Sequence, residues 1–536
     1  MIRTLVVDNF KGSMTTFLEG DINSGFAYVV NVTGYNPFTK PGNLTWCNQA
    51  EQIDAAGSVI TDLIMAGKER VEGGILYVYA IGHTGRLYKI QVNDPTTFNP
   101  DYDNPVLLTT LTSGTPTFTR GASLTFFGAT ERIYIGHDKG VTRIDFTGTN
   151  ETAVTGTWTQ TVPRPIKQFI GKLYVGNGEN IAEIDSTATV STSTKLSPGF
   201  PVGTQVRDID TTPDGNYLQI VSSQQALADI TSITQDTTNT ASTASFIFKW
   251  NGTDTGYTSF DIFPTYALTA NHTFGPYQYT FGYDQFGASV YNPINKLLTG
   301  QEVVSPLPNA VTSTGNILMY LSPLHFEGFM ETDLLVYGTL DFEVGPGYWD
   351  LLSHYPSGDE TDIVQSPYFM PVSNFGLGLS FNGYTDNIYG TSKFYFSTLE
   401  SSDVPTTGYK LFKWVLDTSP SVPSGGAPQE GFYQTQTQLF TKKVSPKEIR
   451  IYGDPWVVNN SFTIDLIGSS GTDATPIPNG SKTFTAGSNL TVGDDFAWYT
   501  PGTAPTYAIG LGITNVGTTN NTINKIEIDY DDRAGK

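Results

Sequence analysis

The sequence is poor in cysteine and contains no long apolar run. Cys47 is the one cysteine in 536 residues, which excludes an intrachain disulfide framework. No apolar stretch reaches the roughly 18 residues that a membrane span needs, so we expect no membrane span. The opening residues, MIRTLVVDNFKGSMTT, lack the apolar core of a secretory signal. We therefore expect synthesis in a cytoplasm.

Positive charge is also scarce. The chain holds 29 Lys and Arg residues against 51 Asp and Glu residues, which gives a net charge of −22. Nucleic-acid binding needs a basic face, and no run of Lys or Arg occurs. We therefore expect no specific nucleic-acid binding, and at most the passage of DNA through an acidic channel that repels it.

The abundant residues are those that suit β-sheets. Aromatic residues make up 13% of the chain and there are 55 glycines. Tyr, Phe, Val, Ile and Thr fit a pleated, half-buried surface better than a helix. Only residues 50–67 could pass for a helix, and their glycine and β-branched side chains favour a strand starting near Ser58. The composition predicts an all-β fold.

A short unit recurs along the chain: an apolar run with an aromatic, a glycine, a polar turn and a second alternating strand. Its copies are residues 76–90, 132–145, 172–185 and 278–291, with glycines at Gly82, Gly136, Gly176 and Gly282. Recurrence at roughly 40–50 residues, with strands and turns only, is typical of β-propeller blades. Counting later strand-like segments, we expect about six or seven irregular blades between residues 58 and 417.

The pattern changes after residues 418–430, which are rich in Pro, Gly and Ser and are predicted to be a linker. Residues 431–536 contain short alternating strands joined by turn-rich loops, which predicts a β-sandwich. Residues 1–57 form a separate N-terminal segment that could supply the strand closing the propeller. The predicted propeller itself covers residues 58–417.

His137 and Asp138 lie in a glycine-flanked turn that would suit either an active site or a β-hairpin. The corresponding pairs in the other copies are His83 and Thr84, Asn177 and Gly178, and Tyr283 and Asp284. Asn, Asp and Gly adopt the backbone conformations that hairpin turns need, and no copy stands apart. We interpret the pair as turn residues, so that His137→Ala should leave assembly and stability nearly unchanged.

Other candidate catalytic or metal-binding residues are scattered. The five histidines, which show no metal-ligand spacing, are His83, His137, His272, His325 and His354. Asp101 with Asp103, or Asp529 with Asp531, could bind Ca²⁺, although solvated loop acids are the simpler interpretation. Cys47 is expected to be an inert buried thiol. We predict no catalytic residue, no metal site and no cofactor.

The opening segment resembles a known group of proteins. Residues 8–46 are similar to the start of many bacteriophage tail proteins, in which F-x-G-[GS]-x…N-V…x-P-G-x-L precedes a β-propeller. The matching residues are Phe10, Gly12, Asn31, Val32, Pro41, Gly42 and Leu44. Residues 247–252, 375–390 and 431–453 also resemble strands of that group, which comprises the nozzle, knob and hub proteins of tailed phages.

The resemblance implies a structural virion protein of the tail nozzle, hub or tip, without enzymatic activity. Such a protein would form a ring of its own copies in the tail, contact adaptor, tube or fibre proteins and serve DNA ejection. Two alternatives remain open. One is a carbohydrate-active or carbohydrate-binding propeller, with carboxylates and aromatics gathered at its axis. The other is a host receptor-binding tail protein, with exposed aromatics in the sandwich loops, for instance near Trp456 or Trp498.

Overall fold

The computed structural model describes part of the chain. The described residues are 2–8, 10, 19–20, 22, 29–33, 43–46, 51–53, 59–62, 64–91, 104–185, 187, 189–224, 243–265, 267–274, 277–284, 287–291, 304–306, 335–339, 346–350, 368–371, 378–386, 391–398, 410–416, 431–468, 476–515 and 521–533. Every regular element in these residues is a β-strand, which confirms the all-β prediction. None of these segments forms a helix with the length and apolar character of a membrane span.

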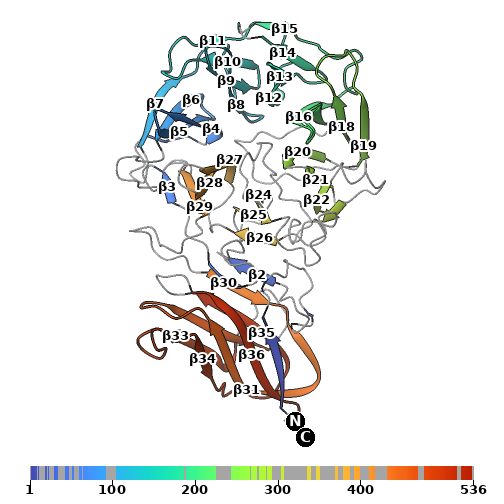
Figure 1. Cartoon of the computed structure of the whole chain (residues 1–536). Coiled ribbons are helices and arrows are strands. Elements are labelled where there is room, and N and C mark those ends of the chain that lie inside the picture. Colours follow the sequence, from blue (N-terminus) through green and yellow to red (C-terminus); the bar gives the residue numbers. More distant parts are fainter. Residues whose placement is uncertain are drawn as a thin grey trace.

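Most of the described strands form small antiparallel sheets whose members follow one another along the chain (Figure 1). The first sheet contains β4 (Ile64–Glu72), β5 (Ile75–Gly82), β6 (Arg86–Gln91) and β7 (Asn104–Thr110), and the second contains β8 (Ser123–Phe127), β9 (Arg132–His137), β10 (Gly140–Ile144) and β11 (Thr152–Ala153). The third sheet contains β12 (Ile166–Phe169), β13 (Lys172–Gly176), β14 (Ile181–Ile184) and β15 (Val190–Thr192). The fourth contains β16 (Gln205–Thr211), β17 (Leu218–Ser223), β18 (Ala244–Trp250) and β19 (Ser259–Pro264).

Three further small sheets follow in the described residues. The fifth sheet contains β20 (Ala267–Phe274), β21 (Tyr277–Asp284), β22 (Gly287–Tyr291) and β23 (Val304–Pro306), and the sixth contains β24 (Leu335–Thr339), β25 (Pro346–Asp350) and β26 (Tyr368–Pro371). The seventh contains β27 (Gly378–Asp386), β28 (Thr391–Thr398), β29 (Lys410–Leu416) and β3 (Glu51–Ile53). Residues 76–90, 132–145 and 172–185 are therefore strand–turn–strand units, and residues 278–291 contain the paired strands β21 and β22, as the sequence predicts. The strand expected near Ser58 begins at Ile64.

The small sheets are arranged in a propeller-like ring. In Figure 1 the first strand of each of the first four sheets lies toward the inside and the last strand toward the outside. Along the chain, β4 packs on β8, β8 on β12, β12 on β16 and β16 on β20, and β27 returns to β4. The hydrophobic core is accordingly divided into layers between neighbouring sheets, such as the layer that joins β4–β7 to β8–β11.

The recurring glycines lie where neighbouring segments approach the hairpin strands most closely. A Cβ at Gly136 would lie 2.6 Å from the carbonyl oxygen of Arg164, and one at Gly176 would lie 2.9 Å from Cβ of Val206. Gly176 is the last residue of β13, and Gly136 is the residue before the last of β9. A side chain at these positions would therefore push apart the sheet and the segment that packs against it, which explains why this part of the pattern repeats.

A larger sheet of nine strands is formed mainly by the C-terminal part of the chain. Its strands are β1 (Ile2–Val7), β2 (Val29–Thr33), β30 (Gly431–Thr435), β31 (Gln438–Gly453), β32 (Ser461–Ile467), β33 (Pro476–Thr485), β34 (Phe496–Tyr499), β35 (Thr506–Asn515) and β36 (Ile523–Asp531). We call this the C-terminal sheet. The two ends of the chain meet in it, because Ile2 pairs with Asp531 (Figure 1).

The N-terminal segment contributes strands to both parts of the molecule. β1 pairs with β36 and β2 pairs with β30, so both belong to the C-terminal sheet. β3 instead pairs with β29 as the outer strand of the last small sheet. Ile53 of β3 is buried with Leu411 of β29 against Val78 and Tyr88 of the first sheet. The linker expected at residues 418–430 lies outside the described residues.

Candidate functional site

His137 and Asp138 are buried at the hairpin between β9 and β10, each with an exposed fraction of 2%. The Asp138 carboxylate accepts hydrogen bonds from the amides of Thr119 and Arg120, both at 2.9 Å, and from Oγ1 of Thr119 at 2.6 Å. Its backbone amide donates to Thr117, and its carbonyl accepts from Thr161. Asp138 thus ties its hairpin to the loop that enters the same sheet, and its carboxylate is used for structure.

His137 makes a separate set of contacts. The amide of Lys139 donates to Nδ1 at 3.4 Å, and Nε2 lies 3.2 Å from Oγ1 of Thr142. Burial, together with the nearby charges of Arg164 and Lys139, lowers the pKa of His137 to about 4. The imidazole is therefore neutral near pH 7, with its proton on Nε2 facing the Thr142 hydroxyl.

Burial changes one expectation drawn from the sequence. A turn histidine in solvent can be truncated at little cost, but His137 packs its ring edge-on against Phe118 at 5.9 Å. Replacing a buried ring by alanine leaves a cavity and removes one of the two hydrogen bonds of the Thr142 hydroxyl, which keeps its bond to the carbonyl of Ser113. His137→Ala is thus expected to lower stability, even though the residue belongs to a turn.

The same structural connection recurs in the neighbouring sheets. Asn177, which follows β13, accepts a hydrogen bond from the amide of Thr159 at 2.9 Å and donates to the carbonyls of Thr157 and Ser193. In the first sheet Thr84 donates from its amide and hydroxyl to the buried carboxylate of Asp62, with which His83 also pairs. Three hairpins are therefore each joined to the loop that enters their own sheet.

A buried arginine lies beside two of these hairpins. Arg164 donates to the carbonyl of Gly176 at 3.0 Å, to Oδ1 of Asn177 at 3.1 Å and to the carbonyl of Thr159. Burial lowers the pKa of Arg164 to about 10, while the charge of Asp138 opposes this shift. Its donors are directed at backbone and amide oxygens, so its contacts connect segments of the ring.

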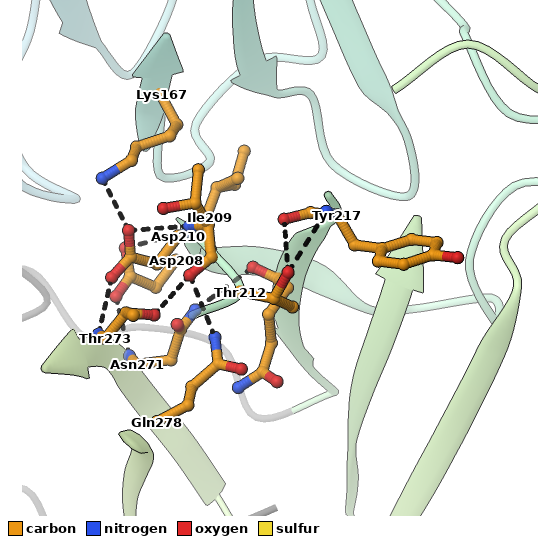
Figure 2. Close-up of polar contacts among 11 residues, drawn as sticks. Lys167, Asp208, Ile209, Asp210, Thr212, Tyr217, Asn271, Thr273 and Gln278 are labelled. Carbon is orange, nitrogen blue, oxygen red and sulfur yellow. Dashed lines mark hydrogen bonds and ion pairs between the residues drawn. The ribbon is translucent and has the colours of Figure 1, made fainter. Parts of the chain in front are cut away.

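Two acidic residues, Asp208 and Asp210, lie on the inner strand β16 and face the next sheet (Figure 2). The Asp208 carboxylate accepts from the amide of Asn271 at 2.7 Å, and the Asp210 carboxylate accepts from the amide of Thr273 at 2.8 Å. Lys167 of β12 pairs with Asp210 at 2.6 Å. The acids therefore join the inner strands of three successive sheets.

The remaining contacts in this cluster have the same character. Asn271 donates to the carbonyl of Gln219 at 3.3 Å, and Gln219 donates to Oγ1 of Thr280 at 3.2 Å (Figure 2 shows Asn271 beside the two acids). Asp208 and Asp210 are both buried. Because backbone amides and an ammonium group already occupy the carboxylates, the cluster holds sheets together and offers no free acid–base pair.

The other residues singled out in the sequence do not gather into a site in the described part of the chain. Asp529 lies beside Asp531 on β36 but pairs with the Arg450 guanidinium at 2.9 Å, a cation that competes with Ca²⁺. No group of three or more His, Cys, Asp or Glu side chains suited to a metal ion occurs among the described residues. Outside them lie Cys47, Asp101, Asp103, His325, His354 and the side chain of His272.

A recurring turn was not anticipated from the sequence: an aspartate turn with the spacing D-x-T-x-T. Asp145 accepts from the amides of Thr147 at 3.1 Å and Thr149 at 2.8 Å, and Asp185 accepts from Thr187 in the same way. These hydrogen bonds lower the pKa values of both aspartates despite the opposing effect of desolvation. The repeated spacing in residues 145–149 and 185–189 was the available signal.

The C-terminal sheet presents a different kind of surface. Along β34 the side chains alternate, so that Ala497 and Tyr499 are buried while Phe496 and Trp498 are exposed. Trp498 is 56% exposed, whereas Trp456, the other tryptophan considered for surface contacts, is only 1% exposed. Of the two tryptophans, Trp498 is therefore exposed but lies on a strand and not in a loop, and Trp456 belongs to the core.

Comparison with known proteins gives no family, because no family model and no curated protein matches the chain. One similar solved structure is the extracellular domain of a proposed one component system from B. thetaiotaomicron, with 10% identity and a TM-score of 0.39, covering 90% of this chain and 61% of that one. Another is the N-terminal domain of Nup159, with 12% identity, a TM-score of 0.39 and coverages of 70% and 95%. A gluconolactonase from Xanthomonas campestris has 8% identity, a TM-score of 0.32 and coverages of 72% and 98%. Likeness at this level supports no statement about activity.

Proposed function

We propose that this chain is a structural virion protein of a tailed bacteriophage, a nozzle, hub or tip component that assembles as a ring of copies in the tail. In this proposal the small sheets are the seven blades of one propeller, and the C-terminal sheet folds as a sandwich beside it. The protein has no catalytic residue and no cofactor. Its partners are its own copies and the adaptor, tube or fibre proteins of the tail.

The proposal rests mainly on the position, within the fold, of the N-terminal residues that resemble those of tail proteins. Phe10 is fully buried and packs edge-on against Tyr433 at 5.6 Å. Leu44 exchanges two backbone hydrogen bonds with Ile523, at 2.8 and 2.9 Å. Phe10 and Leu44, two of the residues that match the tail-protein pattern, thus attach the N-terminal segment to the C-terminal sheet.

The same strand pairing supports a rigid part rather than a mobile enzyme. Asn31 and Val32 lie on β2, which pairs with β30, and the chain then reaches β3 at the edge of the last small sheet. One segment therefore belongs to the ring and to the C-terminal sheet at once. The chain therefore passes between the two parts twice, between β2 and β3 and between β29 and β30, and two connections restrict relative motion more than one, which favours a mechanically stable component.

The polar interior agrees with a structural role. The buried carboxylates of Asp138, Asp208 and Asp210 accept hydrogen bonds from backbone amides, and Asp210 also pairs with Lys167. The acidic net charge of −22 suits a surface that DNA passes without binding. These features support a conduit or connector more than a hydrolase.

The mass of the purified protein in solution, measured together with negative-stain images of the same sample, tests the proposal. We expect a closed ring of about six copies, or a ring that forms when phage tail extract is added. A monomer that stays monomeric at high concentration and with tail extract would overturn it. A polysaccharide-cleaving activity in the purified protein would do the same.

A further inference from the structure

One face of the C-terminal sheet combines exposed aromatic and charged side chains on a regular antiparallel scaffold. In the strand register Trp498 lies opposite Arg450, and Phe496 lies opposite Tyr452. On the next strand Glu527 lies opposite Arg450, and Lys525 lies opposite Tyr452. Because side chains alternate between the two faces of a strand, these residues share one face. We call it the Trp498 face.

The polar side chains of the Trp498 face are held in fixed positions. Arg450 bonds Glu527 at 3.0 Å and Asp529 at 2.9 Å. Tyr452 donates its hydroxyl hydrogen to Glu527 at 3.1 Å, and Lys525 pairs with the same carboxylate at 2.9 Å. The network restrains the rotamers of these long side chains before any ligand arrives, which lowers the entropic cost of binding.

The charges of the Trp498 face largely compensate one another. The arginine and the lysine each lie against carboxylates, so neither sign of charge is left in large excess. Such a surface has little attraction for a polyanion such as a nucleic acid. It does offer the remaining acceptor sites of the carboxylates and of the Tyr452 oxygen, and further guanidinium and ammonium N–H donors, within one small area. This arrangement complements a neutral ligand with many hydroxyl groups, each of which can donate and accept.

The aromatic residues add flat apolar surfaces beside these polar groups. Trp498 is 56% and Phe496 38% exposed, and alternate residues of a strand lie about 7 Å apart. The Phe496 ring is fixed by Tyr452, with the ring centroids 5.2 Å apart. The apolar C–H faces of sugar rings can stack on such aromatic surfaces.

We infer that the Trp498 face is a binding site for a neutral glycan, with Trp498 and Phe496 as the stacking surfaces and the Arg450 network as the hydrogen-bonding groups. Such a site goes beyond a purely structural role, because it would let the protein contact a carbohydrate at the surface of a cell. A second copy of the chain packing on this face is the competing occupant, and the experiment separates the two.

The test is binding of the full-length protein to immobilised microbial polysaccharides that include neutral glucans, mannans and galactans together with acidic polymers. We expect the protein to bind at least one neutral polysaccharide, and we expect that binding does not depend on acidic groups in the polymer. Trp498→Ala should weaken the binding about tenfold or more, and Phe496→Ala should weaken it less. The matched control is Phe260→Ala, which removes an exposed aromatic from β19 in the ring. It should leave the binding unchanged.

Two results would overturn the proposal. One is the absence of binding to every polysaccharide, and the other is binding that Trp498→Ala leaves intact. If Trp498→Ala instead lowers the mass of the assembly without changing glycan binding, the face is a contact between copies. The assembly of wild-type copies into an oligomeric ring is measured separately, so failure of the glycan site and failure of the tail assignment are distinguishable.

Discussion

The polar clusters around Asp138 and Asp208 in the ring are buried, whereas the polar network of the Trp498 face of the C-terminal sheet is partly exposed. In the ring, Asp138 and Asp208 are buried, and their carboxylates are occupied by backbone amides of other segments. Trp250 is buried as well, with its ring 5.2 Å from Tyr174. On the outer face of the C-terminal sheet, Trp498 is exposed and Arg450 bonds neighbouring acids at the surface.

The difference shows where interactions with other molecules can be expected. A propeller-like ring brings many loops and strand edges together, and their polar groups must be paired internally when they are buried. The ring therefore uses its aspartates and asparagines to connect one segment to another. The C-terminal sheet pairs its polar groups within one face and leaves aromatic surface uncovered, which is the combination found in binding surfaces.

The largest effect is expected from truncating a buried tryptophan in the ring. Trp250→Ala removes a fully buried side chain whose Nε1 donates to the carbonyl of Asp254 at 2.9 Å. We expect a loss of about 3–5 kcal/mol in the free energy of unfolding of the ring, because a large cavity remains. Thermal unfolding followed by calorimetry measures it. A shift of the ring transition no larger than that of a surface variant would contradict the assigned core.

A pH effect should follow from His137. Its pKa is about 4 in the folded chain and 6.5 in an ordinary environment. Between these values the unfolded chain binds a proton that the folded chain does not, so the free energy of unfolding falls as the pH falls from 6.5 toward 4. The full loss is on the order of 3 kcal/mol. Urea unfolding at a series of pH values measures it.

The variant His137→Gln isolates this contribution. Glutamine keeps polar atoms near Thr142 and does not titrate. Carboxylates with lowered pKa values, such as Glu72, contribute equally to both proteins. The difference in stability between the wild type and the variant should therefore shrink as the pH falls through this range. A difference that is independent of pH would mean that His137 is not held neutral by the fold.

A somewhat smaller effect is expected from the hairpin connection. Asp138→Ala leaves the amides of Thr119 and Arg120 without their acceptor, and we expect a loss of about 2 kcal/mol in unfolding free energy. Asp138→Asn keeps one oxygen acceptor and should lose about half as much. Chemical unfolding of both variants provides the comparison. Equal stability of the alanine variant and the wild type would show that the connection is not maintained in solution.

The recurring parts of the ring could be predicted from the sequence because they depend on local residues. The hairpins with Gly136 and Gly176 carry their own signal: apolar alternation, a glycine where another segment approaches closely, and a polar turn. Their turn character was also readable from the variety of residues at His137 and its counterparts. The burial of His137 was not, since it depends on how the loop with Phe118 packs over the hairpin.

The contacts between distant segments had no local signal. β1 pairs with β36 from the opposite end of the chain, and nothing in residues 2–7 indicates their partner. The acids of β16 bond strand β20 across 63 positions of sequence, so their role appears only when the sheets are placed side by side. Nothing in the sequence around Trp456 and Trp498 indicates which of them is buried, because this depends on packing within the C-terminal sheet.

The smallest effect on stability should come from Trp498→Ala, which can be compared with Trp456→Ala in the same C-terminal part of the chain. Because Trp498 is more than half exposed, its removal should change the free energy of unfolding by less than about 0.5 kcal/mol. Trp456→Ala, at a buried position 5.1 Å from Phe462, should cost about 3 kcal/mol or more. Calorimetry of the two variants gives both values. A large destabilisation by Trp498→Ala would mean that its ring is needed for packing, and the side chain would then not be available for a ligand.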